Sequence, residues 1–442
     1  MNRYRLLALI LVLLALIIAR HTHAQILLKH ATLIDGRQEV ARPDMDVLIQ
    51  GDTIAAVGKG LQFKGARTID LRGKTIMPAL ISAHTHIGTL RGTTTGSANY
   101  TRANVLAQLQ KYMQYGVGTI QTMGTDRPFI FEGLRDSSAI GLLPGARLHT
   151  AGYGFNVVED TPAPGSAMDL LYRPAAPEQV RAQVEELSRL KVDMVKMWVD
   201  DYGGTSKKMP EDVYLAIIRE AHAHKLRVAS HLYYLEDAKK LVDAGLDVIA
   251  HSVRDQEVDA ALLQAMKDKG VAYIPTLSLD EFSFIYARKP EWINDPFFKA
   301  SLEPGVWEMI TDPKYQDNIR NSPAYDRNVR GFNYALRNVK KAYDAGVLVA
   351  LGTDSGATPV RAQGFSEHLE LELLVQAGLT PLQAIRIGTL NAAAALRLDQ
   401  RYGTVEKGKV ADLLVLDGNP EKDIRLTRKI KTVYKAGRAV YP

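Results

Sequence analysis

The chain of 442 residues contains no cysteine. This absence excludes disulfide bonds and a lipid-modified cysteine. A chain of this length can bury a sizeable core without covalent cross-links, so the lack of cysteine is compatible with an exported protein. The sequence also has no short-period repeat and no low-complexity tract. These absences leave an ordinary folded protein with a barrel-sized main domain and a smaller unit.

A strongly basic surface is missing as well. The formal charge is +6, from 55 Lys and Arg against 49 Asp and Glu. Arg3, Arg5 and Arg20 lie in the first 24 residues, which contain no acid, so the excess in the rest of the chain is only +3. Because no stripe of Lys or Arg is present, we expect no nucleic-acid partner and favour a small-molecule substrate.

The chain has no apolar run of the length that a membrane span needs. The uninterrupted run Leu6–Ala19 falls short of about 18 residues. Basic residues precede it and small residues lead up to Gln25, so residues 1–24 are predicted to be a signal peptide, with an uncleaved anchor as the alternative. We expect an exported protein, periplasmic or secreted, that does not contact the membrane after cleavage. His21 and His23 then belong to the processing segment and not to a metal site.

Both ends of the expected mature chain are β-rich. Residues 25–77 contain short alternating apolar runs separated by Gly/Asp turns, and residues 399–442 have the same character, with a strand at Ala411–Leu416. Neither end has enough strands to be stable alone. We therefore expect a small β-sandwich domain built from both termini.

Residues 78–398 instead alternate between short apolar strands and segments of helical periodicity. An α/β pattern repeated eight times predicts a TIM (β/α)8 barrel. The expected strands are Ile76–His84, Gly118–Met123, Ala146–Gly152, Met194–Trp198, Arg227–His231, Val248–His251, Val271–Leu277 and Val347–Asp354. Residues 282–328 interrupt the alternation with an aromatic-rich insertion. It is either a lid over the substrate side of the barrel or a helical insert packed on the rim.

Six residues with metal-binding side chains stand at the carboxyl ends of these strands, where a barrel brings them to one mouth. They are His84, His86, Lys196, His231, His251 and Asp354. The His-x-His spacing puts two imidazoles on one face of a strand, where both can bind a divalent metal such as Zn²⁺. Asp354 is either a metal ligand that also accepts a proton or a helix cap.

The segment Lys74–Ala83 followed by His-Thr-His resembles the signature of the amidohydrolase superfamily. The resemblance runs from about Gln25 to Pro442 and includes His368–Asn391 and Gly403–Asp412. Within the superfamily the chain is similar to the branch of imidazolonepropionase-like proteins and Xaa-Pro dipeptidases with a carboxylated lysine. It departs from that pattern at Ala79, at Ser82 and in lacking a glycine after His231.

The resemblance implies two divalent metal ions, with zinc as the default. His84, His86 and Asp354 would hold one ion and His231 and His251 the other. Lys196, as N6-carboxylysine, would bridge them. A bare ammonium among apolar neighbours is costly, and the alternative is an ion pair of Lys196 with Asp193, Asp200 or Asp354. A hydroxide bridging the metals would attack the substrate, and Asp354 would act as general base and then acid.

Three further residues are candidates for substrate binding. Tyr233 and Arg254 follow strand-end ligands and would hold a substrate carboxylate, with Arg254 as a two-pronged donor. His149, from the third strand, would bind the oxyanion. For each of these the alternative is plain packing or a surface role, and His368 is expected to be structural.

The leading hypothesis is hydrolysis of an amide C–N bond in an Xaa-Pro-type dipeptide or an N-acyl amino acid. A cyclic amide or lactone hydrolase would use the same metals. A mononuclear deaminase would need a glutamate near strand five, and Glu236 lies too far past His231 to match well. A non-catalytic metal-binding scaffold is disfavoured because all six ligands are present. A homo-oligomer is compatible with the sequence.

Overall fold

The structure is a computed structural model that describes residues 25–158 and 168–441. The predicted signal peptide, with His21 and His23, lies outside the described residues. Within the described ranges no helix is both long and apolar enough to cross a membrane.

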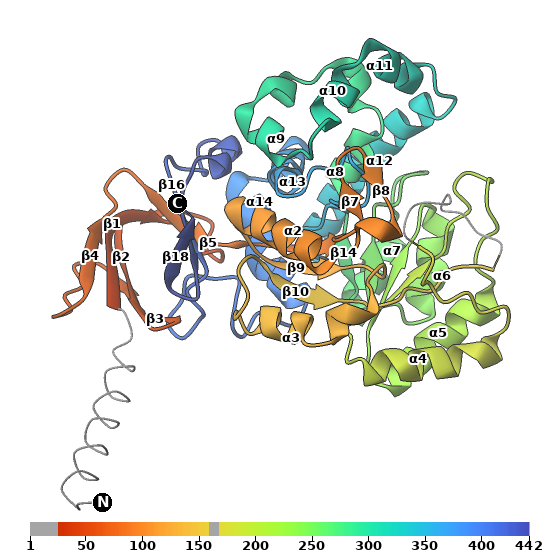
Figure 1. Ribbon diagram of the computed structural model, residues 1–442, viewed down its shortest axis with the longest axis horizontal. Helices are drawn as coiled ribbons and strands as arrows, with labels where there is room; N and C mark the ends of the chain where they lie inside the picture. Colours follow the sequence, from red (N-terminus) through yellow and green to blue (C-terminus); the bar gives the residue numbers. More distant parts are fainter. Residues whose placement is uncertain (1–24, 159–167, 442) are drawn as a thin grey trace, which may run out of the picture.

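The two ends of the chain join in one eight-stranded sheet at one end of the molecule (Figure 1). The hydrogen-bonding pattern gives a single branched sheet, whereas the sequence predicted a sandwich. The nine-residue strand β1 has room for two partners along one edge: Ile26–Lys29 pair with β4, and Thr32 and Leu33 pair with β5. The strands are β1 (Gln25–Leu33), β2 (Arg42–Gln50), β3 (Thr53–Gly58), β4 (Arg67–Asp70), β5 (Thr75–Pro78), β16 (Leu413–Leu416), β17 (Ile430–Lys435) and β18 (Arg438–Tyr441).

Eight parallel strands lie at the eight predicted positions in the central part of the chain. They form a three-stranded sheet in the order β10-β9-β6 and a five-stranded sheet in the order β11-β12-β13-β14-β15. The strands are β6 (Leu80–Thr85), β9 (Val117–Thr122), β10 (Arg147–Thr150), β11 (Val195–Trp198), β12 (Val228–His231), β13 (Val248–Ala250), β14 (Ala272–Ile274) and β15 (Leu348–Val349).

Backbone hydrogen bonds link the two parallel sheets at both of their edges. On one side Phe155, just beyond β10, donates its N–H to the carbonyl of Lys196 in β11, at 2.8 Å. On the other side Ala83 in β6 donates to the carbonyl of Leu351 after β15, also at 2.8 Å. The strands therefore follow one another around a ring in chain order, as the barrel prediction requires.

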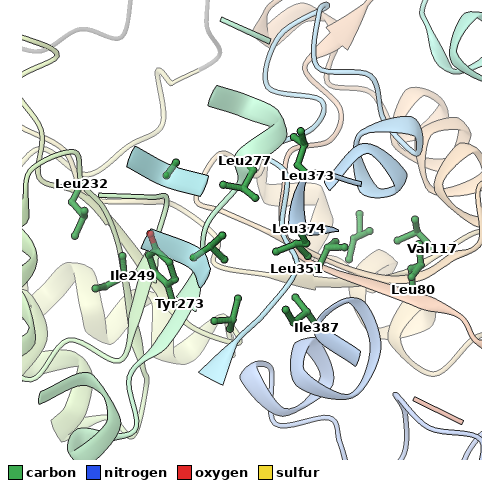
Figure 2. Close-up of a cluster of buried hydrophobic side chains, with 14 of the residues drawn as sticks. Leu80, Val117, Leu232, Ile249, Tyr273, Leu277, Leu351, Leu373, Leu374 and Ile387 are labelled. Carbon is green, nitrogen blue, oxygen red and sulfur yellow. The ribbon is translucent and has the colours of Figure 1, made fainter. Parts of the chain in front are cut away.

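Helices surround the strands and bury their apolar faces against them. In α4 the buried residues Val180, Val184 and Leu187 recur at the spacing of one helical face. Figure 2 shows part of the resulting core, where Leu80 and Val117 pack near Leu351 and Ile387. The helices are α2 (Arg102–Gln114), α3 (Leu134–Ala139), α4 (Val180–Arg189), α5 (Glu211–Ala223), α6 (Leu235–Asp243), α7 (Ala260–Lys269), α12 (Tyr325–Asp344), α13 (Phe365–Gln376), α14 (Pro381–Arg386) and α15 (Ala392–Ala395).

The predicted insertion is helical and aromatic. It begins where α8 (Leu277–Phe282) ends, and it contains α9 (Pro296–Ser301), α10 (Val306–Thr311) and α11 (Pro313–Arg320), joined by short turns of 3-10 helix. Trp292 packs against Phe298 and Phe365, with ring centroids 4.7 and 5.1 Å apart. In Figure 1, α9, α10 and α11 lie at the top of the view, above α8 and α13. These three helices form the middle of the insertion and pack on the rim of the barrel. Only the two ends of the insertion reach the cavity described below.

Candidate metal centre and substrate cavity

A cavity of about 380 Å³ lies at the carboxyl ends of the parallel strands. Five of the six predicted ligands line it: His84, His86, His231, His251 and Asp354. Two of them, His251 with φ 136° and Asp354 with φ 56°, have positive φ values that are uncommon outside glycine. Such backbone conformations concentrate at functional sites. The tertiary structure thus brings together side chains that are up to 270 positions apart in the sequence, from His84 to Asp354.

His84, His86 and Asp354 form the tightest cluster in the cavity. Oδ1 of Asp354 lies 3.1 Å from Nε2 of His84 and 2.8 Å from Nε2 of His86. One ligand atom from each residue lies within 4.8 Å of the others, so the three can hold one metal ion. The second carboxylate oxygen of Asp354 is paired with Arg361. Burial opposes ionisation of Asp354, but Arg361 and His86 together lower its pKa well below the usual range.

The other two histidines lie beside this cluster. The His251 ring centroid is 4.6 Å from that of His84 and 4.3 Å from that of His231. Burial lowers the pKa of His84 to about 3, with a further contribution from Lys196, and burial also lowers the pKa of His231 and of His251. These rings are therefore neutral, and the neutral imidazole is the form that binds a metal ion.

Side chains outside the predicted set hold three of the rings in place. Nδ1 of His86 lies 2.8 Å from the Thr125 hydroxyl, and Nδ1 of His251 lies 2.9 Å from that of Thr276. Nε2 of His231 lies 2.9 Å from a carboxylate oxygen of Asp200. Such partners orient ligand imidazoles. Asp200 lies two residues after the end of β11, so a search of the strand ends could have found it. No local sequence pattern marks Thr125 or Thr276.

A buried carboxylate fixes the ends of the two strands that carry the tightest cluster. Glu367, on α13, accepts hydrogen bonds from the hydroxyls of Ser82, Thr353 and Ser355 at 3.0, 2.6 and 2.9 Å. Ser82, where the family pattern has an acidic residue, thus takes part in orienting the site. Sequence reasoning missed Glu367 because it lies within a helix and not at the end of a strand.

Lys196 is fully buried next to the ligand histidines. Within the described part of the chain its Nζ has no hydrogen-bond partner. The three aspartates considered as its ion-pair partners all bind other side chains: Asp193 lies against His149, Asp200 against His231, and Asp354 against His84, His86 and Arg361. Burial lowers the pKa of Lys196 to about 7, partly offset by Asp354. Nζ lies 5.1 Å from the centroid of the Trp198 ring. A buried amine without a hydrogen-bond partner, next to four ligand side chains, fits a group that is modified or that faces a bound ion.

The substrate-binding predictions fare differently from one another. Tyr233 lines the cavity, whereas His149 is not among the lining residues. Nδ1 of His149 lies 2.9 Å from Oδ1 of Asp193, which precedes β11 and so lies at the opposite end of that strand from the ligands. His368 is structural as predicted, since it is buried and contacts Thr427 and the backbone of Tyr115.

Arg254 lines the cavity, but both of its terminal guanidinium nitrogens already bind other groups of the protein. Nη1 lies 2.9 Å from Oδ1 of Asp280, Nη2 donates to the carbonyl of Leu232, and the guanidinium stacks 4.8 Å from the Tyr233 ring centroid. The sequence predicted that Arg254 binds a substrate carboxylate, but the buried Asp280 on α8 already forms an ion pair with it. Glu236, the residue weighed for a deaminase, is an exposed residue of α6 that pairs with Lys239 and does not line the cavity.

Comparisons with known proteins agree with this architecture. The amidohydrolase family model matches residues 75–440, so the chain belongs to the amidohydrolase family. Ochratoxinase from Aspergillus niger is 26% identical over 274 residues, which are 59% of this chain and 49% of that protein. The chain therefore spans about half the length of that curated relative.

Two further similarities narrow the branch. Imidazolonepropionase from Deinococcus deserti is 39% identical over 107 residues, covering 23% of this chain and 26% of that protein. The crystal structure of a candidate prolidase from Bifidobacterium longum has 26% identity and a TM-score of 0.75, with 95% of each chain covered. The fold is therefore that of the amidohydrolases, a TIM barrel with a smaller domain, and within the family the chain is similar to imidazolonepropionase and to prolidase-like proteins.

Proposed function

We propose that this protein is a metal-dependent hydrolase that cleaves the amide C–N bond of an Xaa-Pro-type dipeptide or an N-acyl amino acid. The observation that carries the proposal is the convergence of His84, His86 and Asp354 within 4.8 Å at one wall of a substrate-sized cavity. The likeness to a candidate prolidase supports the dipeptide class. The position of Glu236 outside the cavity argues against a deaminase.

The donor set supports two divalent ions, of which zinc is the default. His84, His86 and Asp354 would hold one and His231 and His251 the other. When bound, the ions would supply Lewis-acid polarisation of the scissile carbonyl and a water of lowered pKa. The neutral imidazoles of His84, His231 and His251 and the ionised carboxylate of Asp354 are in the protonation states that metal binding needs.

We propose further that Lys196 is carboxylated and bridges the two ions. The support is its complete burial next to the histidine cluster, with no hydrogen-bond partner for Nζ among the described residues. The neutral amine would attack CO₂, forming one N–C bond and releasing one proton. The carbamate would replace an isolated buried ammonium by an anion facing two cations, which removes an unfavourable buried charge.

Asp354 would act as the proton carrier of the reaction. Its Oδ1 faces the histidine cluster and Arg361 fixes the other oxygen, so the carboxylate cannot rotate freely. From this position it would take a proton from the attacking water and deliver it to the leaving nitrogen. We also propose that residues 1–24 direct export, so that the mature protein would work in the periplasm or outside the cell.

Metal content and turnover test the proposal together. The mature protein, produced with zinc and bicarbonate, should contain about two metal ions per chain and should hydrolyse Xaa-Pro dipeptides or N-acyl amino acids. Lys196→Ala should lose most of the metal and nearly all turnover. As a matched control, Lys191→Ala changes an exposed lysine close to β11 and should leave both unchanged. About one ion per chain, unaffected by Lys196→Ala, would contradict the bridged pair.

A further inference from the structure

Among the described residues, each carboxylate that lines the cavity is already paired with a cationic or histidine side chain. Asp280 binds Arg254, Asp354 binds Arg361, and Asp200 lies against His231. Three arginines line the same cavity, and two of them are used in these pairs. The third, Arg327, has no ion-pair partner among residues 25–158 and 168–441. Within the described ranges, the cavity thus contains one guanidinium that has no carboxylate partner.

The position of Arg327 is defined by its neighbours. It lies in the first turn of α12, at the end of the insertion, and is exposed toward the cavity. Its guanidinium lies directly over Gly203, where a Cβ would overlap Nη1. Gly203 has φ 76°, a conformation that glycine adopts without strain. The glycine therefore gives the guanidinium the room to lie against the loop that follows β11.

This loop connects Arg327 to the metal centre. Tyr202, next to Gly203, has its ring centroid 5.7 Å from that of His231. Tyr233 lies close to Gly331, which is one turn after Arg327 on α12. Its hydroxyl is 3.4 Å from the position that a Cβ on Gly331 would occupy. Tyr233 and Arg327 both line the cavity, so a hydroxyl and a guanidinium border the same space near the ligand histidines.

We propose that Arg327 binds the terminal carboxylate of the substrate and makes the enzyme selective for free acids over their neutral amides. This inference rests on the proposed amide hydrolysis and identifies the group that the substrate must carry. A guanidinium binds a carboxylate through two parallel hydrogen bonds, which are stronger than those between neutral groups. Arg327 takes the role that the sequence gave to Arg254, whose Nη1 and Nη2 bind Asp280 and the carbonyl of Leu232.

The first test compares an Xaa-Pro dipeptide with its C-terminal carboxamide in the metal-loaded enzyme. Wild type should prefer the free acid, and Arg327→Met should lose about 10- to 100-fold in kcat/KM for the acid, chiefly through KM. Its activity toward the carboxamide should not change. Arg327→Lys, which keeps the charge but not the two-pronged geometry, should fall between the two.

Arg330→Met is the matched control, since Arg330 is exposed on the same helix and does not line the cavity. It should keep the wild-type preference for the acid. If Arg327→Met kept that preference, the proposal would be overturned. A wild type that cleaves the acid and the carboxamide equally well would overturn it too, while leaving the proposed hydrolysis intact.

A binding measurement keeps the inference testable if no substrate is turned over. N-acetylproline and its carboxamide are titrated calorimetrically into the metal-loaded wild type, Arg327→Met and Arg330→Met. The acid should bind about 10-fold or more tightly than the amide to wild type and to Arg330→Met, and equally to Arg327→Met. Equal binding of the two by wild type would contradict the role of Arg327. Absence of turnover with this binding pattern would instead contradict only the proposed hydrolysis.

Discussion

Oδ1 of Asp354 lies 2.8 Å from Nε2 of His86, while Arg361 holds the other oxygen of the same carboxylate. Both carboxylate oxygens of Asp354 are thus held in place, and the carboxylate is ionised. Asp354→Asn removes the charge and the proton acceptor with little change in shape. We expect kcat to fall by about 100- to 10,000-fold, the range for loss of a general base. Steady-state kinetics and elemental analysis on the same preparation separate lost catalysis from lost metal.

The control for Asp354→Asn is Asp344→Asn, which changes an exposed aspartate at the end of α12. Its kinetics should match those of wild type. Turnover of Asp354→Asn within a few-fold of wild type, with its metal retained, would show that another group carries the proton.

Thr125 and Thr276 each place a hydroxyl within 2.9 Å of Nδ1 of a ligand imidazole. Thr125→Val and Thr276→Val leave these nitrogens unsatisfied and free the rings to rotate. Each should weaken metal affinity about 10- to 100-fold, as is usual for partners of ligand histidines. Competition with a metal chelator measures the affinity. Thr125→Ser and Thr276→Ser keep the hydroxyl and should bind metal nearly as wild type does; equal affinity of the valine and serine variants would rule out the orienting role.

His149 lies against Asp193 and does not line the cavity. His149→Ala should therefore leave kcat and KM within about twofold of wild type, and it should lower stability by about 1 kcal/mol through the lost hydrogen bond. Tyr233→Phe, which removes a hydroxyl from the cavity wall, should change KM instead. Substrate titrations and thermal unfolding of both variants check this contrast. A large drop in kcat for His149→Ala would restore the role that the sequence suggested.

Glu281 is a buried acid on α8, remote from the metal ligands in sequence. Burial and the nearby charge of Glu372 raise its pKa to about 7, above the value near 4.5 expected in the unfolded chain. The folded state therefore binds the proton more tightly. The stabilisation from the protonated form is fully present below pH 4.5 and is lost as the pH rises through about 7.

Glu281→Gln should remove this pH-dependent loss of stability. We expect the free energy of unfolding of wild type to fall between pH 5 and pH 8 by about 1–3 kcal/mol more than that of the variant. Urea unfolding at several pH values gives the comparison. Glu236→Gln, at an exposed position of α6, should follow the wild-type curve. Parallel curves for wild type and Glu281→Gln would show that the buried acid does not control the pH dependence.

Much of the fold and of the metal centre was predictable from local sequence patterns. The strands are short apolar segments that alternate with amphipathic helices, so their order fixes a parallel ring. In a ring of this kind the carboxyl ends of all the strands meet at one mouth. For that reason His84, His86, His231, His251 and Asp354 could be placed together before any distance was known, and all five line one cavity.

The pairing of charges was decided only by the tertiary structure. The sequence offered three aspartates to Lys196, yet none of them binds it, because each lies closer to a histidine or an arginine from another element. Likewise, Arg254 binds Asp280 while Arg327 has no such partner within the described ranges. Ion pairing depends on distances between side chains that are remote in the chain, and the period of a strand or helix carries no information about them. The sequence alone therefore determined where the ligands gather, and packing decided which charges remain available to a metal ion or a substrate.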